Sequence, residues 1–409
     1  MKQTDHTFED IALHAAETGE LTEALAMLEQ GVDVDAPDRY GHAPLLKAAW
    51  YDRPELVVAL LRKGANPNVR SRMGSMPVMV AKNPAIVEAL LVAGADVNAV
   101  TTDKDSNGIE SARTPLMRAA QAGNLAKVQV LLSHGADTEM NDSEGRNALI
   151  GAASRGHYDV AKALVDAGAK IGLVEAALLG DVLLLKTFLE SNADIRSDVI
   201  DNALWWTAGN GQIKSIRTLL DAGADVDARN GREGTALMHA ALMRQPDAIQ
   251  LLIDRGADVN ARNRFGITAL HWSVIYTKSS TDVLRVLLAA GADMNARTWY
   301  SYPTHTGGTA LMEAAAHGSI DCARMLIEYG ADLEISSDID ENGDGGRTAL
   351  IAAVANGRTD IARLFIESGA DINNGGKQGR RPLTIARQRA PRIKNFDIVD
   401  LLVAAGAAE

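Results

Sequence analysis

The 409-residue chain holds a single cysteine, Cys322, so no disulfide bond can form within it. A chain without disulfides is typical of a reducing compartment, and we expect a cytoplasmic protein in which Cys322 is a small core residue. No apolar run approaches the length of about 18 residues that a membrane-spanning helix needs. The N-terminal segment also lacks the apolar core and the cleavage site of a secretory signal, so we expect no membrane insertion.

Aromatic residues are scarce too: they make up 4% of the chain, although apolar residues make up 46%. Ala, Leu and Gly dominate instead, which favours small helices packed in series over a β-sandwich. The formal net charge of −12 disfavours nucleic acid as a partner. Charge is uneven, however, because residues 377–394 contain seven basic residues and no acidic one. We interpret this stretch as a solvated basic end of the fold, or as a docking patch for an acidic partner. These basic residues are Lys377, Arg380, Arg381, Arg387, Arg389, Arg392 and Lys394.

Motifs of catalysis and of nucleotide binding are missing as well. The nine histidines show neither H-x-x-x-H nor H-E-x-x-H spacing, and no Walker loop is present. No Ser-His-Asp or Cys-His set can be recognised. We therefore expect no enzyme and no cofactor, with an unrecognised site in the long loops described below as the alternative.

What the chain does have is a phrase that recurs with a typical spacing of 33 residues. An apolar pair is followed, two residues later, by Gly-Ala-Asp or a variant of it. A second phrase, Thr-(Pro/Ala)-Leu or a variant, comes 11 or 12 residues after many of these copies. A fixed period of this length is typical of a repeat protein. The marker positions are Gly31, Gly64, Gly94, Gly135, Gly168, Asn192, Gly223, Gly256, Gly291, Gly330, Gly369 and Gly406.

Each repeat predicts two helices and a hairpin. Thr can cap the first helix, Pro fits its first turn, and Leu begins its buried face. A Gly such as Gly123 or Gly318 ends this helix, because a left-handed residue there is least strained as Gly. The second helix carries apolar residues at i, i+3 and i+4 and ends at the marker Gly. An Asp/Asn-x-x-Gly turn then predicts a hairpin.

This unit resembles the ankyrin repeat, whose marks include Thr-Ala-Leu-His at 268–271 and Gly-Ala-Asp-Val-Asn at 256–260. The resemblance covers nearly the whole chain. It implies an all-α ankyrin-repeat solenoid, a curved stack of about twelve helix–turn–helix–β-hairpin units, with the hairpins and first helices lining a concave face. It also implies that His271 bonds the neighbouring hairpin. We predict a single array over 1–409, expected as a monomer. Its repeats are 8–37, 38–70, 71–100, 113–141, 142–173, 174–200, 201–229, 230–262, 263–297, 309–336, 347–379 and 380–409.

The array is not uniform. The third repeat has a first helix cut to about one turn by Asn83-Pro84, and the sixth has almost no hairpin, since 168–172 leads directly into its first helix. We expect a break in regular curvature near 168–200. Long hairpin insertions are predicted at 99–112, 297–308 and 335–346, and insertions in repeat proteins often lie on the binding face.

Two of these loops contain Asp-x-Asp-x-Asn-Gly, the first half of a calcium loop. Neither supplies the closing Glu, and the flanking helices of an EF-hand are absent, so a polar turn is the simpler interpretation. We expect no metal site. If calcium did bind, the ligands would be Asp103, Asp105, Asn107, Asp338, Asp340, Asn342 and Asp344.

Ankyrin repeats usually contact partners through the hairpin tips and the end of the first helix. Carrying these positions over gives a set rich in Trp, Tyr, Met and Arg, which are enriched at binding hot spots. The predicted partner-binding residues are Arg39, Tyr40, Trp50, Tyr51, Met73, Leu242, Met243, Arg264, Phe265, Ile275, Tyr276, Trp299, Tyr300 and Tyr302. Trp206 and Trp272 are predicted core residues.

We therefore predict a non-catalytic protein–protein interaction module that binds a partner protein on its concave face. The sequence does not identify the partner. A second hypothesis is an immunity or inhibitor-type protein whose acidic concave face blocks a basic enzyme, and a steep dependence on salt would favour it.

Overall fold

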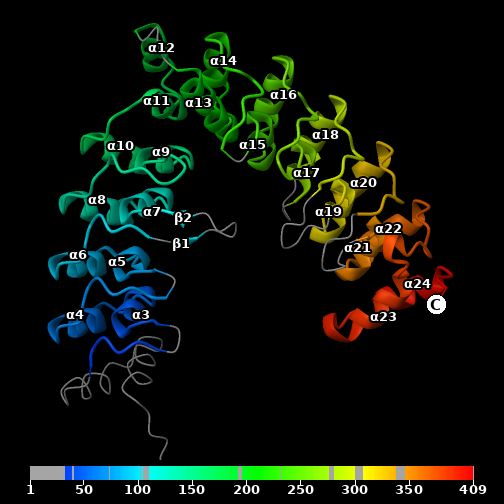
Figure 1. Ribbon diagram of the computed structural model, residues 1–409, viewed down its shortest axis with the longest axis horizontal. Coiled ribbons are helices and arrows are strands. Elements are labelled where there is room, and N and C mark those ends of the chain that lie inside the picture. The colour runs from blue at the N-terminus through cyan, green and yellow to red at the C-terminus, as the bar shows by residue number, and fades with distance from the viewer. Residues whose placement is uncertain are drawn as a thin grey trace, which may run out of the picture. The chain divides into compact units, whose positions relative to one another are not determined.

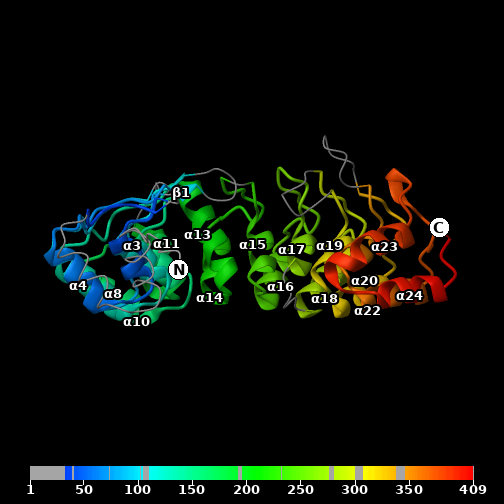
Figure 2. The ribbon, with the colours of Figure 1, turned by 90° about the horizontal axis from the view of Figure 1, so that it is seen from below.

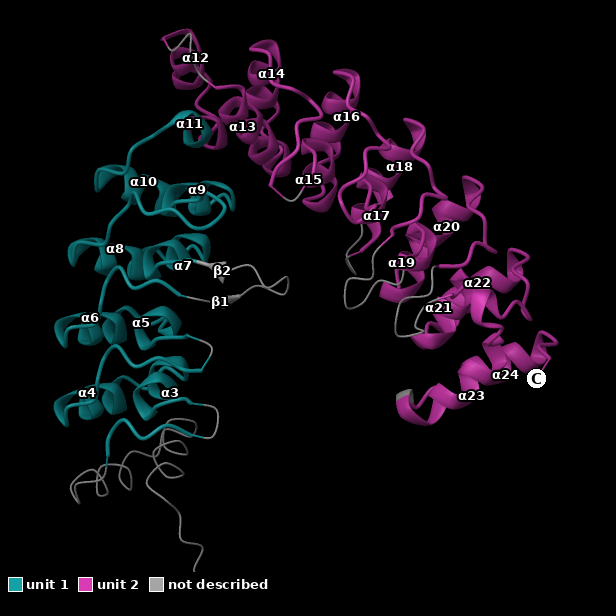
Figure 3. Ribbon diagram, in the orientation of Figure 1, with its two compact units in different colours: residues 1–175 teal, residues 176–409 magenta. Residues whose placement is uncertain are grey.

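The computed structural model describes residues 33–38, 41–72, 74–101, 103–104, 110–191, 196–231, 233–275, 281–299, 307–337 and 346–408. Contacts divide the chain into two compact units, residues 1–175 (unit 1) and 176–409 (unit 2), as Figure 3 shows. The described part is an all-α repeat stack, as the sequence predicted. No helix in these ranges has the length and apolar character needed to cross a bilayer.

Unit 1 stacks pairs of short antiparallel helices (Figure 1). The first helices of the pairs pack against one another in sequence order, and so do the second helices. The first helices are α3 (Pro44–Trp50), α5 (Pro77–Val80), α7 (Pro115–Gln121) and α9 (Ala148–Ala153); the second are α4 (Pro54–Arg62), α6 (Pro84–Val92), α8 (Leu125–Ser133) and α10 (Tyr158–Asp166). Helix α11 (Leu173–Leu179) crosses the boundary between the units.

Unit 2 continues with the same pairing, and Figure 2 shows its helices in two rows, with the connecting loops beyond the row of first helices. We call these connecting loops fingers. The first-helix row is α13 (Ser197–Asn210), α15 (Ala236–Leu242), α17 (Ala269–Val274), α19 (Ala310–His317), α21 (Ala349–Ala355) and α23 (Pro382–Ile393). The second-helix row is α12 (Val182–Ser191), α14 (Ile213–Asp221), α16 (Pro246–Asp254), α18 (Thr281–Ala289), α20 (Ile320–Glu328), α22 (Thr359–Glu367) and α24 (Asp397–Ala404).

The helix caps and glycine stops that the sequence predicted are present at the ends of the helices. Thr114 Oγ1 accepts a hydrogen bond from the Met117 N–H at 3.2 Å, and Thr235 caps α15 in the same way. Gly123 and Gly318 end first helices with φ of +69° and +85°. The Leu of each Thr-x-Leu phrase and the Ala residues that follow it are buried, and each such Leu contributes roughly 2 kcal/mol of hydrophobic stabilisation.

A row of side-chain hydrogen bonds joins successive repeats, and we call it the ladder. The residue two positions after the Asp of Gly-Ala-Asp accepts from the backbone N–H at that Asp position in the next repeat, at 2.7–3.1 Å. Gly172 occupies the ladder position of the fifth repeat and has no side chain to accept with. Early in unit 2, Asp201 on α13 takes this role by accepting from Asp225 N–H at 2.8 Å. The boundary between the units thus falls where the ladder lacks an acceptor.

The predicted irregularities are also present. Helix α5 has only four residues, and only residues 167–172 separate α10 from α11. The expected break in curvature near 168–200 stays a prediction. Helix α13 begins at Ser197, earlier than residue 201, where the sequence places the seventh repeat, because no Gly or Pro interrupts 197–208. In the long loop predicted at 99–112, β1 (Asp103–Lys104) pairs antiparallel with β2 (Glu110–Ser111).

Candidate partner-binding surface

Some of the fingers are held in shape by an Asn with which they begin, as at Asn230 and Asn263. Asn263 Oδ1 accepts from the backbone N–H groups of Phe265 at 2.9 Å and Ile267 at 3.0 Å. The Asn263 carbonyl accepts from Gly266 N–H at 2.8 Å, which closes the turn. Such local side-chain bonds explain the Asp/Asn-x-x-Gly signal, and they place Arg264 at an exposed finger tip.

Two neighbouring fingers form what we call the finger cluster: Arg262, Arg264, Phe265 and Trp299. The backbone N–H of Trp299 donates a hydrogen bond to the Phe265 carbonyl at 3.0 Å, which links one finger to the next. The Arg262 guanidinium lies 5.3 Å from the centre of the Trp299 ring, and that of Arg264 lies 4.8 Å from the Phe265 ring, both within cation–π range. The Trp299 side chain is nevertheless 58% exposed.

A glycine makes this arrangement possible. Gly266 has a φ of +75°, and a Cβ at this position would overlap the Trp299 indole. The indole therefore lies directly against the backbone of the neighbouring finger, so Trp299 is exposed but fixed in place.

A second group lies at the end of α3, where Trp50 is 59% and Tyr51 44% exposed. Asp52 follows with φ of +58°, at the position where other repeats have Gly. At the end of α15 the same three positions hold half-buried Leu242, Met243 at 44% exposure, and Arg244 with φ of +59°.

Several residues that the sequence predicted are not part of this exposed surface or lie outside the described residues. Ile275 is only 9% exposed, because it packs in the core, and so it offers a partner little area. Trp206 is buried as predicted, whereas Trp272 is half-buried. Outside the described residues lie Arg39, Tyr40, Met73, Tyr276, Tyr300 and Tyr302, as well as Asp105, Asn107, Asp338, Asp340, Asn342 and Asp344. Of the calcium candidates only the backbone of Asp103 is described, in β1, and calorimetric titration with Ca²⁺ would test that prediction.

His271 has the structural role that the resemblance implied. Its Nε2–H donates a hydrogen bond to the Gly308 carbonyl at 3.3 Å. Its Nδ1 accepts one from the Thr268 hydroxyl at 2.9 Å. Burial lowers the pKa of His271 to about 4, so the ring is neutral near pH 7.

The sequence did not predict a stack between α13 and α15. The rings of Trp205 and His239 lie parallel at 3.6 Å, and Trp206 meets Trp205 edge-on at 4.9 Å. His239 Nδ1 donates to the Trp205 carbonyl at 2.9 Å, and burial lowers the pKa of His239 to about 4. The adjacent pair Trp205-Trp206 was the available signal.

Nor did the sequence predict the role of Lys127. This lysine occupies a position of the second helix that is apolar in most repeats, such as Val160, and it is 3% exposed. Its Nζ donates to the carbonyls of Val78 (2.8 Å), Met79 (3.3 Å) and Ala81 (2.6 Å), at the end of the four-residue helix α5. An amine at this end satisfies carbonyls that a longer helix would have bonded internally.

The structure is that of a solenoid repeat protein, because helix pairs stack in sequence order, fingers connect them and the ladder joins successive repeats. Family models confirm the kind of repeat: one described as ankyrin repeats (3 copies) matches 78–175, 173–263 and 261–337, one described as ankyrin repeats (many copies) matches 311–366, and the single ankyrin repeat matches 40–72. The chain belongs to the ankyrin-repeat family. Ankyrin repeats are generally protein-binding modules.

Similar proteins include the B-cell lymphoma 3 protein homolog of Mus musculus, 32% identical over 169 residues that make up 39% of this chain and 36% of that protein. The neurogenic locus notch homolog protein 1 of Xenopus tropicalis is 35% identical over 153 residues, 36% of this chain and 6% of that protein. A crystal structure of an ankyrin repeat domain from Acinetobacter baumannii AYE is 31% identical, with a TM-score of 0.42, over 50% of this chain and 98% of that one. The chain thus spans little more than a third, or less, of these two curated relatives.

Proposed function

We propose that this chain is a non-catalytic module that captures a partner protein on the face formed by its fingers and first helices. The observation that carries the proposal is the exposure of Trp50 and Trp299 on that face. Leaving more than half of an indole in water forgoes on the order of 2 kcal/mol of burial free energy. Exposed aromatic side chains on a stable scaffold are typical of binding hot spots.

The finger cluster supports the proposal further, because its members are held before any partner arrives. The backbone hydrogen bond between Trp299 and Phe265 and the close packing on Gly266 restrict the indole. A side chain that is already ordered loses less conformational entropy on binding, so more of its contact free energy remains as affinity.

Exposed apolar side chains also occur on or beside the second helices, among them Val92, Leu183 and Tyr329. In the described residues, however, both tryptophans that are more than half exposed belong to a finger or to a first helix. The second-helix residues therefore serve as controls rather than as candidates.

The test is partner capture by affinity purification and mass spectrometry. We expect the wild-type chain to retain a protein that Trp50→Ala/Tyr51→Ala, or Trp299→Ala, retains several-fold less. Tyr329→Ala removes an exposed aromatic beside α20 and should capture as the wild type does. Unchanged capture by both aromatic variants, with circular dichroism showing intact helices, would refute the assignment of this face.

The inhibitor hypothesis is supported by the net charge of −12. It requires an association rate with a basic enzyme that falls steeply as salt increases. An association rate that does not change with salt would exclude that role and leave the general binding function standing.

A further inference from the structure

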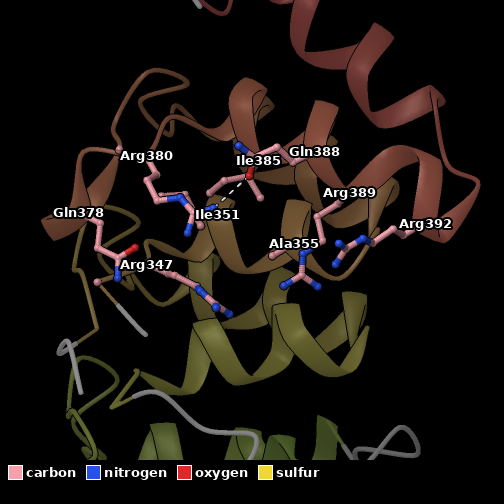
Figure 4. A pocket seen from close by; sticks show the side chains of 11 residues that line it. Arg347, Ile351, Ala355, Gln378, Arg380, Ile385, Gln388, Arg389 and Arg392 are labelled. Atoms are coloured by element: carbon pink, nitrogen blue, oxygen red, sulfur yellow. Dashed lines mark hydrogen bonds between the residues drawn. The ribbon is translucent and has the colours of Figure 1, made fainter. Parts of the chain in front are cut away.

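A basic cavity lies at the C-terminal end of unit 2, over α21 and α23, with a volume of about 390 Å³. It is lined by four arginines and two glutamines, and none of the lining residues that the structure describes is acidic. Figure 4 shows the guanidinium ends of Arg347, Arg389 and Arg392 directed into the space beside Ala355. The polar lining residues are Arg347, Gln378, Arg380, Gln388, Arg389 and Arg392.

These cations come from three separate places in the chain. Arg389 and Arg392 are three residues apart on α23 and so share one face of that helix. Arg380 comes from the turn before α23, and Arg347 from the segment before α21. Sequence alone showed the cluster of 377–394 but not Arg347, because only the fold brings that residue to the same cavity.

The described residues give no counter-charge to Arg380, Arg389 and Arg392. Arg380 donates to the neutral Gln388 side chain at 3.1 Å. Within the described part of the chain, neither Arg389 nor Arg392 forms an ion pair. Like charges gathered in one partly enclosed space repel, and a bound anion would relieve that repulsion.

The floor of the cavity is apolar. Ile351, Ala355 and Ile385 line it and are themselves almost completely buried. Because they are buried, they offer a ligand little apolar area, so the arginines decide what can bind here. A cavity of this volume has the size of a small-ligand pocket, so it accepts only a short stretch of chain.

We propose that this cavity binds an acidic segment of a partner protein, whose carboxylates pair with Arg380, Arg389 and Arg392. Arg is suited to this task because its planar guanidinium forms two parallel hydrogen bonds with one carboxylate. The proposal rests on the proposed function, since its ligand is part of a protein. A long polyanion is disfavoured because the chain as a whole carries a charge of −12, whereas a short segment experiences chiefly the local field.

The test measures by fluorescence anisotropy how the full chain binds a short fluorescein-labelled oligo-glutamate peptide. The variant Arg389→Gln/Arg392→Gln should bind it at least about tenfold more weakly than the wild type. The matched control is Arg324→Gln/Arg363→Gln, which removes two exposed arginines from α20 and α22 and so changes the net charge equally. The control should bind like the wild type.

Three results would overturn the proposal. They are no binding by the wild type, equal weakening in both double variants, and displacement of the peptide by inorganic phosphate but not by chloride at the same ionic strength. The last would identify a phosphate site instead. If the Gln variant fails to fold, Arg389→Lys/Arg392→Lys keeps the charge but loses the paired hydrogen bonds, and it must still weaken binding several-fold.

This experiment is independent of the aromatic variants. Peptide binding at the cavity can fail while Trp50 and Trp299 still control partner capture, and the reverse outcome is equally distinguishable.

Discussion

Replacing Lys127 with Met tests how the third repeat holds together with a first helix of only four residues. The variant keeps most of the side-chain volume but removes the donors to Val78, Met79 and Ala81. Each hydrogen bond contributes about 1 kcal/mol net, and a carbonyl left buried without a partner costs somewhat more. Removing the burial cost of the amine offsets part of this, so we expect a net local destabilisation of about 2–3 kcal/mol.

The pH dependence sharpens this prediction. Burial, assisted by the nearby charge of Arg118, lowers the pKa of Lys127 from 10.5 to about 7. Between these two values the unfolded chain binds more protons than the folded one, so stability rises as pH increases from 7 towards 10.5. The advantage of the wild type over Lys127→Met should therefore grow with pH, by up to about 1.4 kcal/mol per unit.

The assay is amide hydrogen exchange of residues 77–92, compared between variant and wild type at equal pH so that intrinsic rates cancel. We expect faster exchange in the variant, with a ratio that increases from pH 7 to pH 9. Lys82→Met changes a nearby exposed lysine and should leave exchange unaltered. Exchange in Lys127→Met as slow as in the wild type would refute the capping role, and a ratio independent of pH would refute the lowered pKa.

Three further predictions concern single side chains. Arg244→Gly should raise the melting temperature, because Arg244 has φ of +59° where Gly is unstrained, and relieving this is worth about 1 kcal/mol; a lower melting temperature would contradict the strain argument. Asn68→Ala should speed exchange of the Asp96 amide, which donates to Asn68 Oδ1 at 2.8 Å, at a cost of about 1 kcal/mol, whereas Asn68→Asp keeps the acceptor and should lose less. The pKa of His271 is about 4 in the folded chain and 6.5 in the unfolded chain, so its contribution to stability is present above pH 6.5 and is lost as pH falls to 4. Unfolding measured as a function of pH should show a loss of free energy of up to about 3 kcal/mol that is absent in His271→Gln.

The candidate surface could be predicted only in part. The ends of first helices and the finger tips follow from the repeat register, so Trp50, Tyr51 and Trp299 were found correctly as exposed side chains. Exposure within that register depends on neighbours, however. Ile275 occupies a predicted contact position and is buried, because the sequence does not show how closely adjacent repeats cover it.

The sequence by itself determined the repeat, its helix pairs and their ends, because caps, glycine stops and apolar periodicity act within a few residues of chain. The tertiary structure alone decided which distant residues meet. Lys127 caps carbonyls 46 to 49 residues away, Trp205 stacks on His239, and Arg347 joins the arginines of α23. These contacts depend on how one repeat lies on the next, and a pattern with a 33-residue period does not contain that information.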